Sequence, residues 1–331
     1  MSLSSSSSSS SSIQSIQRKY KYMSSYHYMK PLHTRDDLWE VFSKDCGVGP
    51  NYTQFFSFNE VTRSSLNEDK IIYETFFKNT DLDHGTMSTA SKTKGGGGRR
   101  GTYVELGAFD GKQQSNSMFY DKCLQWDGLL IEGQPGNYQK VLQNRPYAHK
   151  MSFAPSCKKE ESSTNSNNQT VEFAKYPMPN SGLTGYAKEY DGRPTVHVPC
   201  GPLTPVLQDI FPNIDRQQQS WFNLTSTPTT NNGGGSRNSS SSSKSNKPTI
   251  NFFSLDVEGS EHLVLETIDF QKVQIDVMMI EVQSVFCKND DCVVRKQVRH
   301  RMVEVEGYTI YKHLVKNSDV YVHPNSPYQM K

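Results

Sequence analysis

The stretch YVELGAFDG, residues 103–111, decides the fold class of this chain. It continues an apolar run, Thr102–Leu106, which has the length and character of a buried strand, and Gly107 permits the sharp turn that follows. Ligands of open α/β sheets bind beyond the carboxyl ends of the strands. The turn after this strand is therefore a candidate binding site.

The residues of this turn favour a cationic ligand that has no phosphates. A dinucleotide site needs the spacing G-x-G-x-x-G, with backbone amides directed at a pyrophosphate, whereas Gly107 and Gly111 have the spacing G-x-x-x-G. Glu105 and Asp110 flank the turn, and their charges would repel a phosphate. The alternative is a purely structural turn between a strand and a helix.

Further along the chain, apolar runs of strand length alternate with helical patterns. We expect helices that begin near Ser115 or Asn116 and near Glu261. The expected strands after the first are 128–131, 148–153, 250–255, 277–282, 308–313 and 320–323, the last two as an antiparallel hairpin. This order predicts an α/β fold with a mostly parallel sheet covered on both faces.

Glu132 follows the second expected strand, whose last residues are LLI. An acid at this strand end lies where a ribose diol needs a hydrogen-bond acceptor. A solvated acid at the end of a strand is the alternative. Together with the preceding turn, the position favours ribose binding.

A third acidic site follows the strand in FFSLDVEGSEH, residues 252–262. Asp256 and Glu258 lie at its carboxyl end, where they can orient an acceptor hydroxyl or take its proton. With Glu281 from the next strand they could instead hold a divalent cation, but we expect no metal. His262 is expected in the first turn of the following helix rather than as a base.

Several of these stretches together resemble the FkbM methyltransferase family, and within it the eukaryotic Star-like branch. The matching motifs are YVELGAFDG with the following SNS, then WDGLLIEGQPGNY, VPCGPLTPVLQDI, FFSLDVEGSEHLVLETIDF and MMIEVQ, in family order over about 101–323. The resemblance implies a Rossmann-like class I methyltransferase fold, with a seven-stranded, mostly parallel sheet and a C-terminal antiparallel hairpin. It also implies S-adenosylmethionine as cofactor and transfer of its methyl group to a hydroxyl of a sugar, a glycan or another small metabolite.

The resemblance also implies roles for individual residues. Glu105, Gly107 and Gly111 would line the methionine part of the cofactor, and Glu132 would bind its ribose. Asp256 and Glu258 would face the transferred methyl group, with Asp256 as first choice for the base and Glu281 in support. The full set expected to bind the cofactor is Glu105, Gly107, Ala108, Asp110, Gly111, Ser115, Asn116, Glu132, Ser152 and Asp256.

Two departures from the family pattern leave another class open. Phe109 stands where a small or amide residue is usual, and Gly133-Gln134 stands where a proline commonly follows the acid. A non-catalytic binding or trafficking module that keeps the fold, as in the Star-like branch, is the main alternative, and Phe109 could be its signature. A dehydrogenase is the third hypothesis.

Composition excludes some functions. The net charge of the 331 residues is +2, without a dense basic block, so we expect no nucleic-acid partner. The chain has no apolar run of transmembrane length and no apolar signal core at its N-terminus. The serine-rich, acid-poor N-terminus resembles a transit peptide, although a disordered repeat tail is the favoured interpretation. We expect a cytoplasmic or organellar protein.

Low-complexity tracts divide the chain. We expect a disordered tail over 1–34, a helical extension over 35–84, a glycine-rich linker over 85–100 and the methyltransferase domain over 101–331, with insertions at about 158–169 and 225–247. The six cysteines form no C-x-x-C pair, and Cys287 and Cys292 are close enough for a loop disulfide in an oxidising compartment. Sequons at Asn51, Asn168, Asn223 and Asn238 permit a secretory history.

Overall fold

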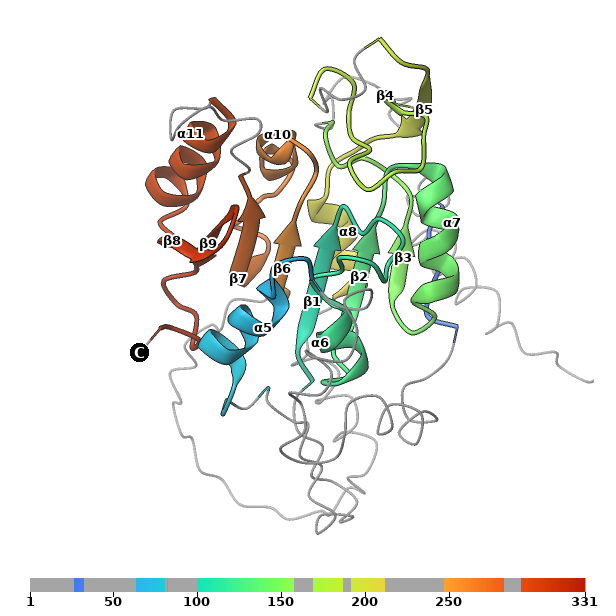
Figure 1. The fold of residues 1–331 in the computed structure, drawn as a ribbon. Coiled ribbons are helices and arrows are strands. Elements are labelled where there is room, and N and C mark those ends of the chain that lie inside the picture. Colours follow the sequence, from blue (N-terminus) through green and yellow to red (C-terminus); the bar gives the residue numbers. More distant parts are fainter. Residues whose placement is uncertain are drawn as a thin grey trace, which may run out of the picture.

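A seven-stranded sheet forms the centre of the computed structural model, in the order β3-β2-β1-β6-β7-β9-β8 (Figure 1). The first five strands in this order are parallel, and β9 and β8 are antiparallel to their neighbours. Their bounds are β1 (Thr102–Leu106), β2 (Asp127–Ile131), β3 (His149–Met151), β6 (Thr249–Leu255), β7 (Gln274–Glu281), β8 (Thr309–Val315) and β9 (Ser318–Val322). The predicted α/β fold, with its C-terminal antiparallel hairpin, is confirmed.

The structure describes residues 27–32, 64–80, 82, 100–157, 169–186, 192–211, 247–282 and 293–330. The expected linker and the two insertions lie outside these residues, apart from the last residue of each, as does most of the expected tail. Cys287, Cys292 and the four sequons lie outside them too. Among the residues that the structure describes, every helix is too short or too polar to span a bilayer.

Alternate residues of each central strand lie on opposite faces of the sheet, and both faces are buried. Val104, Phe253 and Met278 belong to one core, whereas Tyr103 and Phe252 belong to the other. This double burial explains the continuous apolar runs in the sequence. The first core includes residues of α8 (Thr204–Ile210), α10 (Glu261–Glu266) and α11 (Val293–Arg299), and the second includes residues of α5 (Glu68–Ile72), α6 (Met118–Lys122) and α7 (Pro135–Asn144).

The segment before the expected linker contributes to the second core. A π-helical turn, η3 (Tyr73–Phe77), continues α5, and Phe77 is fully buried. The ring of Phe77 meets that of Trp126 edge to face, with 5.0 Å between the ring centres. The indole N–H of Trp126 also donates a hydrogen bond of 3.3 Å to the Leu82 carbonyl. Helical residues of the N-terminal extension thus pack directly on the sheet.

A small second sheet lies above the carboxyl ends of β1, β2 and β3 (Figure 1). Its two antiparallel strands are β4 (Thr170–Ala174) and β5 (Thr195–Pro199), neither of which was among the expected strands. A disulfide between Cys157 and Cys200, with 5.5 Å between their Cα atoms, ties this sheet to the segment that follows β3. The small sheet and that segment together form one wall of the pocket described next.

Candidate functional site

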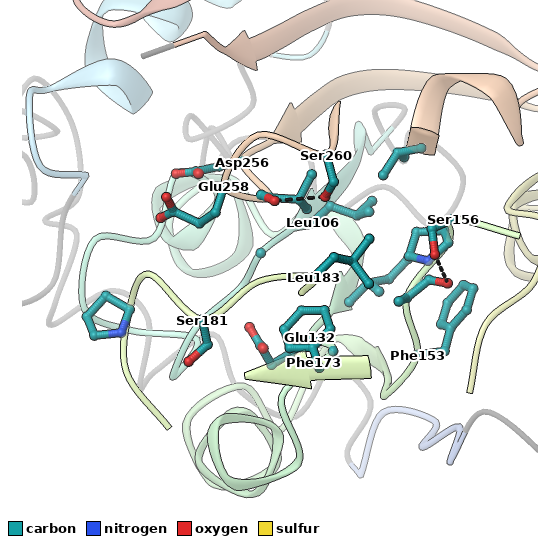
Figure 2. Close-up of a pocket in the computed structure, with 18 residues that line it drawn as sticks. Leu106, Glu132, Phe153, Ser156, Phe173, Ser181, Leu183, Asp256, Glu258 and Ser260 are labelled. Carbon is teal, nitrogen blue, oxygen red and sulfur yellow. Dashed lines mark hydrogen bonds between the residues drawn. The ribbon is translucent and has the colours of Figure 1, made fainter. Parts of the chain in front are cut away.

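A pocket opens at the carboxyl ends of β1, β2 and β6. The main sheet contributes Leu106–Gly107, 131–133 and 256–258, and the wall opposite is formed by 153–156, Phe173, Pro179, Ser181 and Leu183. Figure 2 shows Glu132 beside Phe173 at one side of the pocket, and Asp256 with Glu258 at the other.

Gly107 forms part of the pocket lining with bare backbone. Its φ of +77° is a left-handed conformation, and a Cβ atom there would lie 1.7 Å from the Asp256 carbonyl oxygen. The Asp256 N–H in turn donates a hydrogen bond of 3.2 Å to the Leu106 carbonyl. The ends of β1 and β6 therefore approach so closely that only glycine fits between them.

Glu132 is held in place by amides from two neighbouring turns. The Phe109 N–H donates to its Oε2 and the Gln134 N–H to its Oε1, both at 2.8 Å. Burial raises the pKa of the Glu132 carboxyl to about 8, although these hydrogen bonds and one from the Asn137 side chain act in the opposite direction. An acid at this place can accept hydrogen bonds from a ribose diol, as the sequence predicts.

Glu105 does not line the pocket. Its buried carboxylate accepts hydrogen bonds from the Ser115 hydroxyl at 2.9 Å, the Asn116 N–H at 2.7 Å and the Ser117 hydroxyl at 2.5 Å. The Asn116 side chain also donates to the Ser254 hydroxyl at 3.1 Å. Three of the residues expected at the cofactor thus bind one another outside the pocket lining, and they hold the loop that leads into α6.

Arg145 is the centre of this network, and sequence reasoning missed it. Its side chain is fully buried and donates to Asp121 Oδ2 at 2.6 Å, to the Tyr103 hydroxyl at 2.7 Å and to the Gly111 carbonyl at 3.2 Å. Its Nη1 lies 3.7 Å from the Glu105 carboxylate. The arginine therefore joins the end of α7 to the turn after β1.

The other expected cofactor residues lie outside the pocket lining, most of them in the turn after β1 and Ser152 directly after β3. Asp110 accepts the backbone N–H groups of Lys112 and Gln113, and Gly111 packs against α7. Ala108 and Ser152 are buried. The backbone of Phe109 has a left-handed φ of 47°, and Lys140 Nζ lies 5.2 Å from the centre of its ring, against α7. The Phe109 ring is therefore not part of the pocket lining.

Three acids converge where β6 and β7 end. Asp256, Glu258 and Glu281 each place one carboxylate oxygen within 4.8 Å of the others. Burial raises the pKa of the Asp256 carboxyl well above its ordinary range, and the nearby Glu281 and Glu258 carboxylates raise it further. Asp256 and Glu258 line the pocket, whereas Glu281 is not part of its lining. The structure thus brings together the three residues expected at the transferred group.

Glu261 and His262 have other surroundings. Glu261 Oε1 accepts the backbone N–H groups of Val257 at 3.2 Å and Gly259 at 3.1 Å, which fixes the loop between β6 and α10. His262 lies in the first turn of α10, as expected, with its ring 5.7 Å from that of Tyr186. It does not line the pocket.

Comparison with protein families decides the assignment. The family model described as the methyltransferase FkbM domain matches residues 105–308, which is more than half of the chain. This chain belongs to the FkbM methyltransferase family. Searches of curated proteins and of solved structures found no match. Membership implies an S-adenosylmethionine-dependent methyltransferase.

The pocket of this FkbM domain fits that cofactor. The acids at the ends of β6 and β7 suit a ligand with a positively charged group, and the bare backbone at Gly107 lets a ligand approach closely. Glu132, Gly107 and Asp256 are the residues of the expected set that could contact the cofactor in this pocket.

Proposed function

We propose that this chain is an O-methyltransferase that uses S-adenosylmethionine to methylate a hydroxyl of a sugar or another small metabolite. One observation carries the proposal: a single pocket has Glu132, the acid expected to bind the ribose, on one side and the acids Asp256 and Glu258 on the other. The bare backbone of Gly107 lies between the ends of the strands that carry them.

Different residues of the pocket would bind different parts of the cofactor. Glu132 accepts the ribose hydroxyls, and the apolar side chains of Phe153, Phe173 and Leu183 offer a wall for the adenine ring. The bound cofactor supplies a methyl group on a positively charged sulfur, which is a good leaving group. Glu105 contributes to cofactor binding only indirectly, because its carboxylate binds the loop at Ser115–Ser117 and does not line the pocket.

The acids at β6 and β7 act on the acceptor. Their negative charge favours a cationic ligand in the pocket, and their position at its edge allows them to align an acceptor hydroxyl. A carboxylate oxygen of this cluster takes the hydroxyl proton as the oxygen bonds to the methyl carbon, with Asp256 as first choice.

The competing proposal is a non-catalytic module of the Star-like branch. Phe109 was its expected signature, because a large ring in this turn could fill the site. The ring instead lies beside Lys140 on α7 and leaves the pocket open, which supports the enzyme.

Calorimetric titration with S-adenosylmethionine tests the proposal. We expect binding by the full chain, loss of binding in Glu132→Ala, and unchanged binding in Glu304→Gln, an exposed acid distant in sequence. Absence of binding by the wild type, with no methyl transfer from radiolabelled cofactor to any fraction of a cell extract, would overturn the proposal. Binding of NADH instead would indicate the dehydrogenase.

A further inference from the structure

Asp256, Glu258 and Glu281 form a compact acidic cluster at two neighbouring strand ends. Leu255 of β6 pairs with Ile280 of β7 in parallel register, so the next residues along each strand lie side by side. One carboxylate oxygen from each acid lies within 4.8 Å of the other two. Like charges at such distances repel strongly when they are shielded from water.

Asp256 adds an independent sign that a ligand belongs there. Its Oδ1 atom is buried and has no hydrogen-bond partner, while the carboxyl group also shares a hydrogen bond with Glu281. Buried carboxylate oxygens are normally satisfied, because an unsatisfied one loses its hydration without compensation. A cation at the centre of the cluster would satisfy this atom.

Glu258 has an unfavourable backbone conformation. Its φ of 57° is left-handed, which is uncommon for a residue with a long side chain. Figure 2 shows its carboxyl group next to that of Asp256. Glu261, by contrast, is occupied by the amides of Val257 and Gly259, so it fixes the loop rather than joining the cluster.

We propose that Asp256, Glu258 and Glu281 bind a hard divalent cation, and that this cation binds the hydroxyl oxygen of the methyl acceptor. Three carboxylates without nitrogen or sulfur ligands select Mg²⁺, Ca²⁺ or Mn²⁺. Ca²⁺ binds oxygens at about 2.3–2.6 Å and Mg²⁺ at about 2.0–2.1 Å. Three carboxylates with oxygens within 4.8 Å of one another can contribute ligands to either ion.

Binding of the acceptor hydroxyl by the cation rests on the proposed methyltransferase function, and it restricts the class of acceptor. Three carboxylate ligands leave further coordination positions for water or acceptor oxygens. An acceptor with two adjacent hydroxyls can fill two of these positions and is thereby oriented toward the pocket. The cation lowers the pKa of a bound hydroxyl, whose proton passes to a cluster oxygen that does not bind the cation.

Cation binding is tested on the full chain without cofactor or acceptor. After treatment with EDTA and its removal, the protein is titrated with MnCl₂, and free Mn²⁺ is measured by electron paramagnetic resonance. We expect one tight Mn²⁺ per chain, displaced by excess Ca²⁺ or Mg²⁺. Asp256→Asn and Glu281→Gln should each weaken binding by about tenfold or more, whereas the control Glu304→Gln should not. Circular dichroism checks that each variant is folded.

Two results overturn the cation site: no Mn²⁺ binding by the wild type, or equal binding by folded Glu281→Gln. A folded wild type that binds Mn²⁺ but not S-adenosylmethionine upholds the site and refutes the proposed function. If both bind, EDTA should abolish methyl transfer to a diol acceptor while the cofactor still binds. Transfer that persists in EDTA overturns the acceptor half of the proposal.

Discussion

The backbone N–H of Phe109 donates a hydrogen bond of 2.8 Å to Glu132 Oε2, and this bond ties the turn after β1 to the end of β2. Glu132, which would bind the ribose, is thus oriented by the turn after β1, and Gly107 of the same turn lines the pocket. Its orientation is fixed before any ligand binds, and its burial leaves it protonated through much of the neutral range.

Glu132 should therefore make cofactor affinity depend on pH. Because its pKa is about 8, the carboxylate that accepts ribose hydroxyls becomes the main form only above that pH. We expect the affinity for S-adenosylmethionine to rise between about pH 7 and 9, as measured by calorimetry. Glu132→Gln should bind more weakly and lose this pH dependence; an unchanged slope in the variant would contradict the assignment.

The same residue should affect stability without ligand. The folded-state pKa of about 8 lies above the ordinary 4.5, so the folded state holds this proton more tightly than the unfolded state. The free energy of unfolding should accordingly fall between these pH values, by at most about 1.4 kcal/mol per pH unit from this group. Thermal melts of the wild type and Glu132→Gln from pH 5 to 8 should differ in slope, with the variant flatter. Parallel curves would exclude the effect.

Gly107→Ala should damage both stability and binding. The added Cβ would lie 1.7 Å from the Asp256 carbonyl oxygen, so the end of β6 must move. We expect a loss of more than about 2 kcal/mol in urea unfolding and no measurable cofactor binding. Gly185→Ala is the matched control, because its φ of +87° is similarly left-handed but open space surrounds it. That variant should lose only about 1 kcal/mol.

Arg145→Met should destabilise the domain strongly, because it removes the guanidinium that pairs with the buried Asp121 and Glu105. Removal of one partner from a buried ion pair typically costs about 3–5 kcal/mol, which urea unfolding can measure. Arg145→Lys keeps the charge but not the planar set of donors, so it should be intermediate. The exposed Lys272, which pairs with Asp269, offers a control whose replacement by Met should change little.

Phe77→Ala should unfold the domain at lower denaturant although Phe77 precedes the matched family region. The side chain is fully buried against Trp126 and Tyr120. Loss of a buried phenylalanine costs about 3–5 kcal/mol. Equal stability of the variant would show that the N-terminal helical segment is dispensable.

The central strands were predictable because each is buried on both faces and appears as a continuous apolar run, as in Phe252–Leu255. Glu132 and Asp256 were predictable as pocket residues for a similar reason, since each directly follows such a run. The strands β4 and β5 were missed: each is a five-residue segment with only a few apolar residues, a weak signal between polar tracts.

The position of Glu105 could not be inferred from neighbouring residues. Besides the loop that follows, its surroundings include Arg145, which comes after β2 and α7 in the chain and carries no local motif. The direction of the Phe109 ring likewise depends on a left-handed backbone and on Lys140 of α7. The orientations of the Glu105 carboxylate and the Phe109 ring are therefore decided by contacts between elements rather than by sequence patterns.

The disulfide between Cys157 and Cys200 has a practical consequence for work on this protein. It closes a loop with a sequence separation of 43 and adjoins Ser156, a residue of the pocket wall. Such a cross-link typically adds about 2–4 kcal/mol to stability. Dithiothreitol in the purification buffer, or expression where thiols stay reduced, would leave that wall unbraced, so oxidised and reduced preparations should be assayed as two different samples.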